Sequence, residues 1–149
     1  MKRSERLDVV QQAASRTERE RAERVGAAER HLIEMQQKLT ALEKYRGEYE
    51  NGFASRAGAG ADVIGMRDFQ TFLARLGEAL AQQRELVALA QGALDAERSQ
   101  WREAAQRAHV VETLAERWQG EESRAANRRD QQESDELSQQ RAATKDTKS

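Results

Sequence analysis

The sequence predicts an all-α protein: an elongated antiparallel coiled-coil hairpin of two helices with an overhanging C-terminal helix. None of the 149 residues is a proline, so the chain contains no strong helix breaker. Charged residues make up 34% of the chain and hydrophobic residues only 38%, which is too polar for a compact core of ordinary size. The apolar residues recur every three or four positions, which is typical of helices that bury a narrow stripe against each other.

The first helix is predicted over about residues 3–53. Its apolar positions step by threes and fours from Leu7 onward, which is the spacing of a heptad seam. Two polar residues, Thr17 and Arg21, interrupt the stripe without changing its period. The residues expected to face the second helix are Leu7, Val10, Ala14, Thr17, Arg21, Val25, Ala28, Leu32, Met35, Leu39, Leu42, Tyr45, Tyr49 and Phe53.

A loop is predicted over about residues 54–65. Four of the nine glycines lie in the stretch 51–65, together with Asn51 and Asp62, and these residue types favour turns and helix caps. A phosphate-binding loop would need a preceding strand and a following Lys-Ser or Lys-Thr pair, and neither is present. We therefore interpret the glycines as a turn between two helices.

The second helix is predicted over about residues 66–138, and residues 139–149 are predicted to form a flexible tail without a seam. Residues 1–141 would thus form a single hairpin. Fourteen of seventeen seam positions in this helix are apolar. They are Phe69, Leu73, Leu76, Leu80, Gln83, Val87, Ala90, Leu94, Glu97, Trp101, Ala104, Ala108, Val111, Ala115, Trp118, Glu122 and Ala125.

Folding one helix back on the other predicts which residues face each other, because the numbers of facing residues should add to about 118. The expected pairs are Leu42 with Leu76, Leu39 with Leu80, Tyr49 with Phe69, and Leu7 with Val111. The rule also places Arg21, the charged seam residue of the first helix, opposite Glu97, a charged seam residue of the second. A charged pair at an apolar seam contributes more to register than to stability. Our hypothesis is that Arg21 and Glu97 fix the register of the hairpin.

The second helix is longer than the first, so residues from about Trp118 to Arg141 should have no partner within the chain. An exposed tryptophan on an unpaired helix is a candidate docking surface. The alternative is that a second copy of the chain buries it. The residues that we expect to face a partner protein here are Trp118, Arg117, Arg124, Arg128 and Arg129.

The sequence offers little material for catalysis, and we expect no enzyme, cofactor or metal. A two-helix hairpin has almost no concavity, and His31 and His109 would lie about twenty residues apart along it. Cysteine is absent, which excludes thiolate ligands. Acidic and basic residues are interspersed rather than clustered, so nucleic acid is not an expected partner. The start of the chain has no apolar run typical of a signal peptide, which favours the cytoplasm.

An aromatic section of the seam lies near the predicted loop. Tyr45 and Tyr49 are one turn apart, and Phe72, beside Leu73, should lean toward the rim of the seam and contact Tyr45. Two interpretations stay open, a wider core near the loop or a binding patch, since tyrosine and phenylalanine recur at interface hot spots. The six residues of this section are Leu42, Tyr45, Tyr49, Phe72, Leu76 and Ala79.

Several segments resemble the FliJ family of flagellar type III export proteins, in the same order and over nearly the whole chain. They are LTALEKYRGEYENG at 39–52, MRDFQTFLARLGEALAQQRE at 66–85, WREAAQR at 101–107, ETLAERW at 112–118 and NRRDQQESDELSQQR at 127–141. The resemblance implies a two-helix stalk similar to that of rotary ATPases. It implies that the terminal end enters the hexameric ring of the export ATPase FliI.

The same resemblance implies contact with the export gate protein FlhA, through a surface similar to the six-residue aromatic section. Lys38 and Gln83 depart from the family pattern beside it. Export chaperones are further implied partners, and the chain would reach the membrane only indirectly through the gate, as a monomer when isolated. Two alternatives stay open: the stalk of a virulence type III secretion system, and an unrelated coiled-coil scaffold that forms homodimers.

Overall fold

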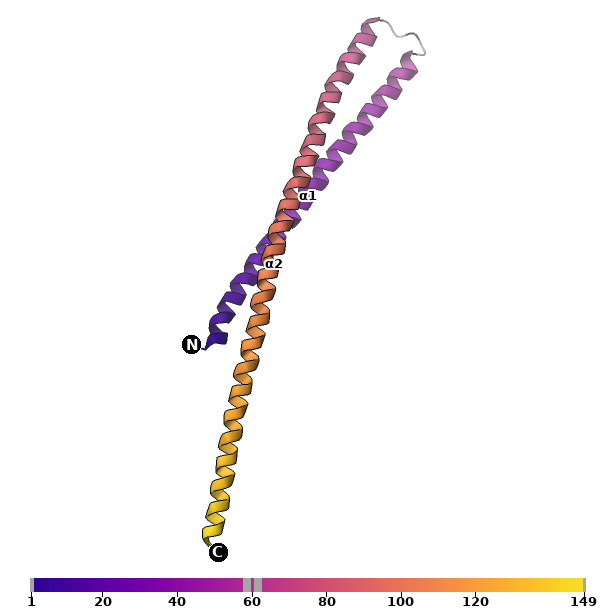
Figure 1. The fold of residues 1–149 in the computed structure, drawn as a ribbon. Helices are drawn as coiled ribbons and strands as arrows, with labels where there is room; N and C mark the ends of the chain where they lie inside the picture. Colours follow the sequence, from indigo (N-terminus) through magenta and orange to yellow (C-terminus); the bar gives the residue numbers. More distant parts are fainter. Residues whose placement is uncertain (1, 58–59, 61–62, 149) are drawn as a thin grey trace. The chain divides into compact units, whose positions relative to one another are not determined.

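The computed structural model describes residues 2–57, 60 and 63–148. Two helices make up nearly all of this part of the chain: α1 (Arg3–Ala57) and α2 (Val63–Lys148), as Figure 1 shows. The described residues contain no strand. Gly60, between the helices, has a φ of 98°, a left-handed conformation that glycine adopts without the steric penalty of a Cβ atom. The predicted all-α, two-helix class is confirmed.

Both helices extend beyond the bounds expected from sequence. α1 continues from about residue 53 to Ala57, and α2 begins at Val63 rather than near residue 66. The alanines of FASRA favour helix strongly enough to shorten the turn. Asp62 and Gly58, which we also assigned to the loop, lie outside the described residues. At the other end α2 continues through the segment predicted as a tail, which contains neither glycine nor proline.

The chain divides into two compact units, whereas the sequence suggested a single hairpin over residues 1–141. The terminal unit combines Met1–Glu18 with Ala104–Ser149, and the loop unit consists of Arg19–Glu103. Each unit contains part of both helices. On α1 the division falls between the polar seam residues Thr17 and Arg21, where few apolar groups are available to join neighbouring parts of a core.

The loop unit has a largely apolar seam, which Gln83 and Glu97 interrupt. Leu80 is fully buried, and Leu76 is 7% exposed. Burying a leucine side chain contributes about 1.5–3 kcal/mol, so these positions account for much of the stability of the pair of helices. Further along the same seam lies a cluster of four buried residues with three partly buried neighbours: Leu32, Met35, Ala90 and Leu94, with Val25, Ala28 and Val87.

Ion pairs between the helices of the loop unit lie along one edge of this seam. Arg84 Nη2 lies 3.8 Å from Glu43 Oε1, and Arg98 Nη2 lies 3.4 Å from Glu29 Oε1. Both pairs are about half exposed, so each contributes little to stability. Their partners are two heptads apart on both helices, which shows that a seven-residue repeat persists along this edge.

The terminal unit has a thinner seam. Leu7, Ala104 and Ala115 are buried, but Val10 is 50% exposed. The small residues leave a hollow of about 230 Å³, whose lining includes Val10, Ala14, Thr17, Ala104 and Val111. Val111 therefore lies beside Val10 and Ala14 at this hollow. Small side chains leave such hollows because they do not interlock deeply. The pairing of Leu7 with Val111 stays a prediction.

The last part of α2 has no helix beside it within the terminal unit. Figure 1 shows the yellow end of α2 continuing past the N-terminus of α1. Every described side chain from residue 126 to residue 147 is exposed. The predicted overhang is present, but it begins after the turn that contains Ala125 rather than at Trp118. No helix in the described part of the chain is long and apolar enough to cross a membrane.

Candidate protein-binding surfaces

Five aromatic side chains form a ladder across the loop unit. The rings of Phe53 and Phe69 stack with centroids 3.7 Å apart, and Tyr49 stacks on Phe69 at 5.3 Å. Tyr49 also contacts Phe72 at 4.3 Å, and Phe72 meets Tyr45 edge to face at 6.0 Å. The predicted pairs Tyr49–Phe69 and Tyr45–Phe72 are therefore confirmed.

The six residues of the aromatic section differ in what they can offer a partner. Tyr45 is 50% exposed, while Leu76 is buried. Leu42, Tyr49, Phe72 and Ala79 are half-buried. Phe72 meets the ring of Tyr45 edge to face and is itself in contact with Tyr49, so Tyr45 packs on one side while half of its surface stays in solvent. Such a rigid, partly exposed aromatic group suits a binding hot spot.

The charged seam residues make contacts that differ from those expected. Arg21 Nη1 donates a hydrogen bond to Gln100 Oε1, one turn away from Glu97. Glu97 Oε2 is buried and accepts no hydrogen bond within the described part of the chain. Pairing with the buried carboxylate of Glu97 would require the arginine to lose its own hydration. Bonding to an exposed amide at the rim of the seam has a smaller desolvation free energy. The role of Arg21 and Glu97 in setting register stays a hypothesis.

Trp118 is covered by the start of α1. The guanidinium of Arg3 lies over its ring, 4.1 Å from the centroid, and the residue is half-buried. The expectation that Trp118 would be exposed past the amino terminus is wrong, because α1 begins early enough to reach it. A cation above an indole face is a favourable contact. A partner protein would have to displace Arg3 to use the indole ring.

The arginines beyond Trp118 are on the surface of α2. Arg117 lies 3.8 Å from Glu121 of the next turn, a surface pair of small energetic value. Arg124, Arg128 and Arg129 are exposed. Arg117, Arg124 and Arg128 are seven and four residues apart, so they share one face of the helix. This arginine face begins in the packed part of the terminal unit and continues onto the overhang.

A polar clamp that sequence reasoning missed joins the start of α1 to α2. Ser4 donates to Glu122 from its backbone nitrogen at 3.3 Å and from Oγ at 2.5 Å. Arg3 Nη2 lies 3.0 Å from Glu121 Oε2. The hydrogen bonds from Ser4 lower the pKa of Glu122, with smaller contributions from Lys2 and Arg3. The sequence feature that could have predicted this clamp is Glu122, an acidic residue at a seam position. It faces the N-terminus of α1, which attracts negative charge.

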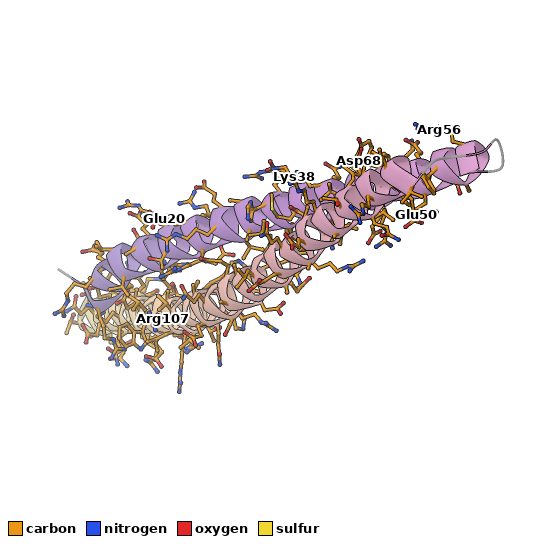
Figure 2. The ribbon with its side chains drawn as sticks, turned by 90° about the horizontal axis from the view of Figure 1, so that it is seen from above. Glu20, Lys38, Glu50, Arg56, Asp68 and Arg107 are labelled. Carbon is orange, nitrogen blue, oxygen red and sulfur yellow. The ribbon has the colours of Figure 1, made fainter. Side chains whose placement is uncertain are left out.

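The described residues include no group of three or more His, Cys, Asp or Glu side chains that could hold a metal ion. Charged side chains instead project outward along both helices, as the labelled Glu20, Glu50 and Arg107 illustrate in Figure 2. Apart from the small hollow in the terminal unit, the surfaces described above are helix faces and edges. Those features suit contact with other proteins more than enclosure of a small molecule.

Comparison with known proteins gives a consistent picture. Residues 2–147 match the model of a family described as "Flagellar FliJ protein". The chain is 29% identical over 139 residues to the flagellar FliJ protein of Escherichia coli strain K12, covering 93% of this chain and 95% of that one. It is 27% identical over the same length to the flagellar FliJ protein of Salmonella typhi, with the same coverage. No solved structure matches the chain significantly.

Proposed function

Because the chain belongs to the flagellar FliJ protein family, we propose that it is a non-catalytic component of the flagellar type III export apparatus. Within that apparatus it acts as the central stalk of the export ATPase FliI, contacts the export gate FlhA and escorts export chaperones. It works in the cytoplasm and reaches the inner membrane only through the gate. The alternative stalk of a virulence secretion system would share this architecture and differ in its partners.

The overhang of α2 is the observation that carries the stalk role. Residues 126–147 are exposed around the whole helix, and no part of α1 covers them. Helices in proteins gain most of their stability from packing against other elements. This unpacked segment would therefore become more ordered inside a partner. The arginine face of Arg117, Arg124, Arg128 and Arg129 supplies charge that a ring of acidic side chains would attract.

A two-helix stalk inside a six-fold ring would act through its asymmetry. One face of α2 carries arginines, so six identical subunits cannot all make the same contact with it. The stalk would stabilise one subunit interface at a time, and its differential affinity would bias the ring toward one conformation. Nucleotide turnover in the ring would in this way be coupled to events at the gate.

The aromatic section supports the proposed contact with the gate. Tyr45 presents half of its surface to solvent and packs against Phe72, which in turn contacts Tyr49. Leu76 lies beneath the surface, so it supports the patch rather than touching a partner directly. Lys38 lies one heptad before Tyr45 and adds a charge to the rim of the same surface.

The stalk role is tested by the ATP hydrolysis rate of the cognate export ATPase with this chain added. Stimulation should saturate near one chain per hexamer, that is about one copy per six subunits. Reversing Arg124 and Arg128 to glutamate should reduce this stimulation, while reversing Lys145 near the end of the overhang serves as the matched control. An unchanged rate with the folded wild-type chain at every ratio would contradict the stalk role.

The gate contact is tested separately with Tyr45→Ala and the matched control Ile33→Ala. Both residues are about half exposed and belong to the loop unit. Tyr45→Ala should weaken binding to the purified cytoplasmic domain of FlhA by about tenfold, or 1.4 kcal/mol, and leave ATPase stimulation intact. Equal binding by the two variants would contradict this surface, and joint loss of both activities would indicate unfolding.

A further inference from the structure

The segment of α2 between Glu85 and Asp95 is unusual for this chain. Residues 86–94, LVALAQGAL, form the longest uncharged run in a sequence that is 34% charged. One side of this run faces the core, where Ala90 and Leu94 are buried. The other side is exposed: Leu86 retains 45% and Leu89 64% of its surface. A helix that is apolar on both sides is normally covered on both sides.

The exposed side of this run continues the aromatic section along one edge of the loop unit. The Tyr45–Phe72 contact marks that edge on both helices. Seven-residue steps from Phe72 along α2 lead to Ala79, Leu86 and Ala93. The same repeat holds on the opposite edge, where the Glu43–Arg84 and Glu29–Arg98 pairs are two heptads apart. One edge of the unit therefore carries ion pairs and the other carries apolar side chains.

The apolar edge has room for a closely approaching helix. Leu86, Leu89, Ala93 and Ala96 follow each other at steps of three, four and three, which is the spacing of a second coiled-coil seam on α2. Nothing lies within 4 Å of the position that a Cβ atom would take on Gly92. Large residues followed by small ones leave space at one end of the seam for a partner's large side chains.

The charges beside the seam differ between the two helices. On α1, seven-residue steps back from Tyr45 give Lys38, His31 and Arg24. Figure 2 shows Lys38 projecting into solvent, and its nearest acid is Glu34 of the same helix, at 3.4 Å. On α2 the outer flank of the seam carries Glu85. The edge is thus bounded by Lys38 and Arg24 on the α1 side and by Glu85 on the α2 side.

We propose that this apolar edge binds an amphipathic α-helix of a partner protein as the third strand of a coiled coil. The partner helix carries large apolar residues at heptad spacing, carboxylates on the flank that faces α1, and cations on the flank that faces Glu85. A second copy of the chain fits less well, since a two-fold contact at this edge brings the α1 cations of both copies together. The proposal does not depend on the stalk role.

The test uses a designed helix of about 21 residues as the probe, with leucine at both seam positions, glutamate on one flank and lysine on the other. Its binding to the full chain is measured by fluorescence anisotropy. Leu89→Asp should weaken binding by about tenfold or more, whereas Ile33→Asp, which alters a similarly exposed residue away from this edge, should change it by less than about twofold. Ala93→Arg should weaken binding as Leu89→Asp does.

Charge-swapped pairs give a second readout. A peptide with lysine in place of the glutamate flank should bind the wild-type chain more weakly and regain affinity for Lys38→Glu. Equal affinity of both peptides for both chains, or full binding by folded Leu89→Asp, overturns the proposal. A dimer of the wild-type chain in sedimentation, lost in Leu89→Asp, together with no binding of the peptide to the wild-type chain, also overturns the proposal. The occupant of the edge would then be a second copy of the chain. These results do not involve the export ATPase or the gate.

Discussion

Gln83 donates a hydrogen bond of 3.0 Å from Nε2 to the backbone carbonyl of Met35, across the seam between α2 and α1. Gln83 is only 8% exposed and is the buried polar side chain of the described core. The pair obeys the facing rule expected from sequence, unlike Arg21, which bonds to Gln100. A single buried amide at a coiled-coil seam favours one register over others because any slip would leave it without a partner.

Replacing Gln83 with leucine should keep or raise stability while weakening the preference for one register. The Met35 carbonyl remains in its helical hydrogen bond, so no buried acceptor is orphaned, and the buried amide is removed. We expect a change in the free energy of unfolding between zero and about +1 kcal/mol, measured by urea denaturation. Gln82→Leu, on the exposed side, is the control. A loss of more than about 2 kcal/mol would show that the hydrogen bond is itself a major source of stability.

Leu80→Ala should be among the most damaging single changes in the loop unit. Leu80 is fully buried, and removing its side chain leaves a cavity between two long helices that can close only in part. We expect a loss of about 2–5 kcal/mol in thermal or urea unfolding. Leu89→Ala, at a residue that is 64% exposed, should cost less than about 0.5 kcal/mol. Similar losses for the two variants would mean that the seam is assigned to the wrong face of α2.

The Ser4–Glu122 clamp predicts a pH dependence of the terminal unit. The pKa of Glu122 is lowered in the folded chain, so its ionised form stabilises folding above the ordinary glutamate pKa of about 4.3. That contribution is lost as pH falls through the lowered folded pKa. The difference in stability between wild type and Glu122→Gln should be present at neutral pH and vanish in acid. Amide exchange at the start of α1 would report it, and a difference independent of pH would contradict the assignment.

Gly92→Ala should stabilise α2. Gly92 lies inside the helix, and a Cβ atom there would meet nothing within 4 Å. Alanine lowers the conformational freedom of the unfolded chain and has the higher helix propensity, so we expect a gain of about 0.5–1 kcal/mol in thermal unfolding. Gly60→Ala offers the opposite case, because its φ of 98° is strained for any residue with a side chain. If both changes stabilise, backbone conformation is not what distinguishes the two sites.

Glu97→Leu should also stabilise the loop unit. One carboxylate oxygen of Glu97 is buried and accepts no hydrogen bond from the described residues, which is costly for a charged group. Leucine would restore the heptad pattern at this position, and we expect a gain of about 1 kcal/mol or more in urea unfolding. Combining it with Arg21→Leu tests the register hypothesis. If the two residues pair, the effects of the single changes will not add.

The heptad pattern by itself determined the two helices, the presence of a turn and the overhang. Side chains at steps of three and four must share a helix face, and apolar ones in water must find a second helix to cover them. Most seam positions were therefore predictable, as were the aromatic contacts Tyr49–Phe69 and Tyr45–Phe72. Three expected seam residues of α1, Val10, Thr17 and Tyr45, are exposed instead. The C-terminal end of α2 was not predictable, because its last residues include no helix breaker. Only the presence or absence of packing partners could determine where the helix ends.

Only the tertiary structure decided which polar groups meet. Long side chains such as Arg3 and Arg21 can reach several partners. Which partner they contact depends on the local rotation of the helices and on the desolvation free energy of each partner. Sequence periodicity does not fix these quantities to within one turn. Arg3 thus covers Trp118, and Ser4 rather than a seam residue binds Glu122. The division into two units likewise depends on how deeply small seam residues interlock, which the heptad pattern does not specify.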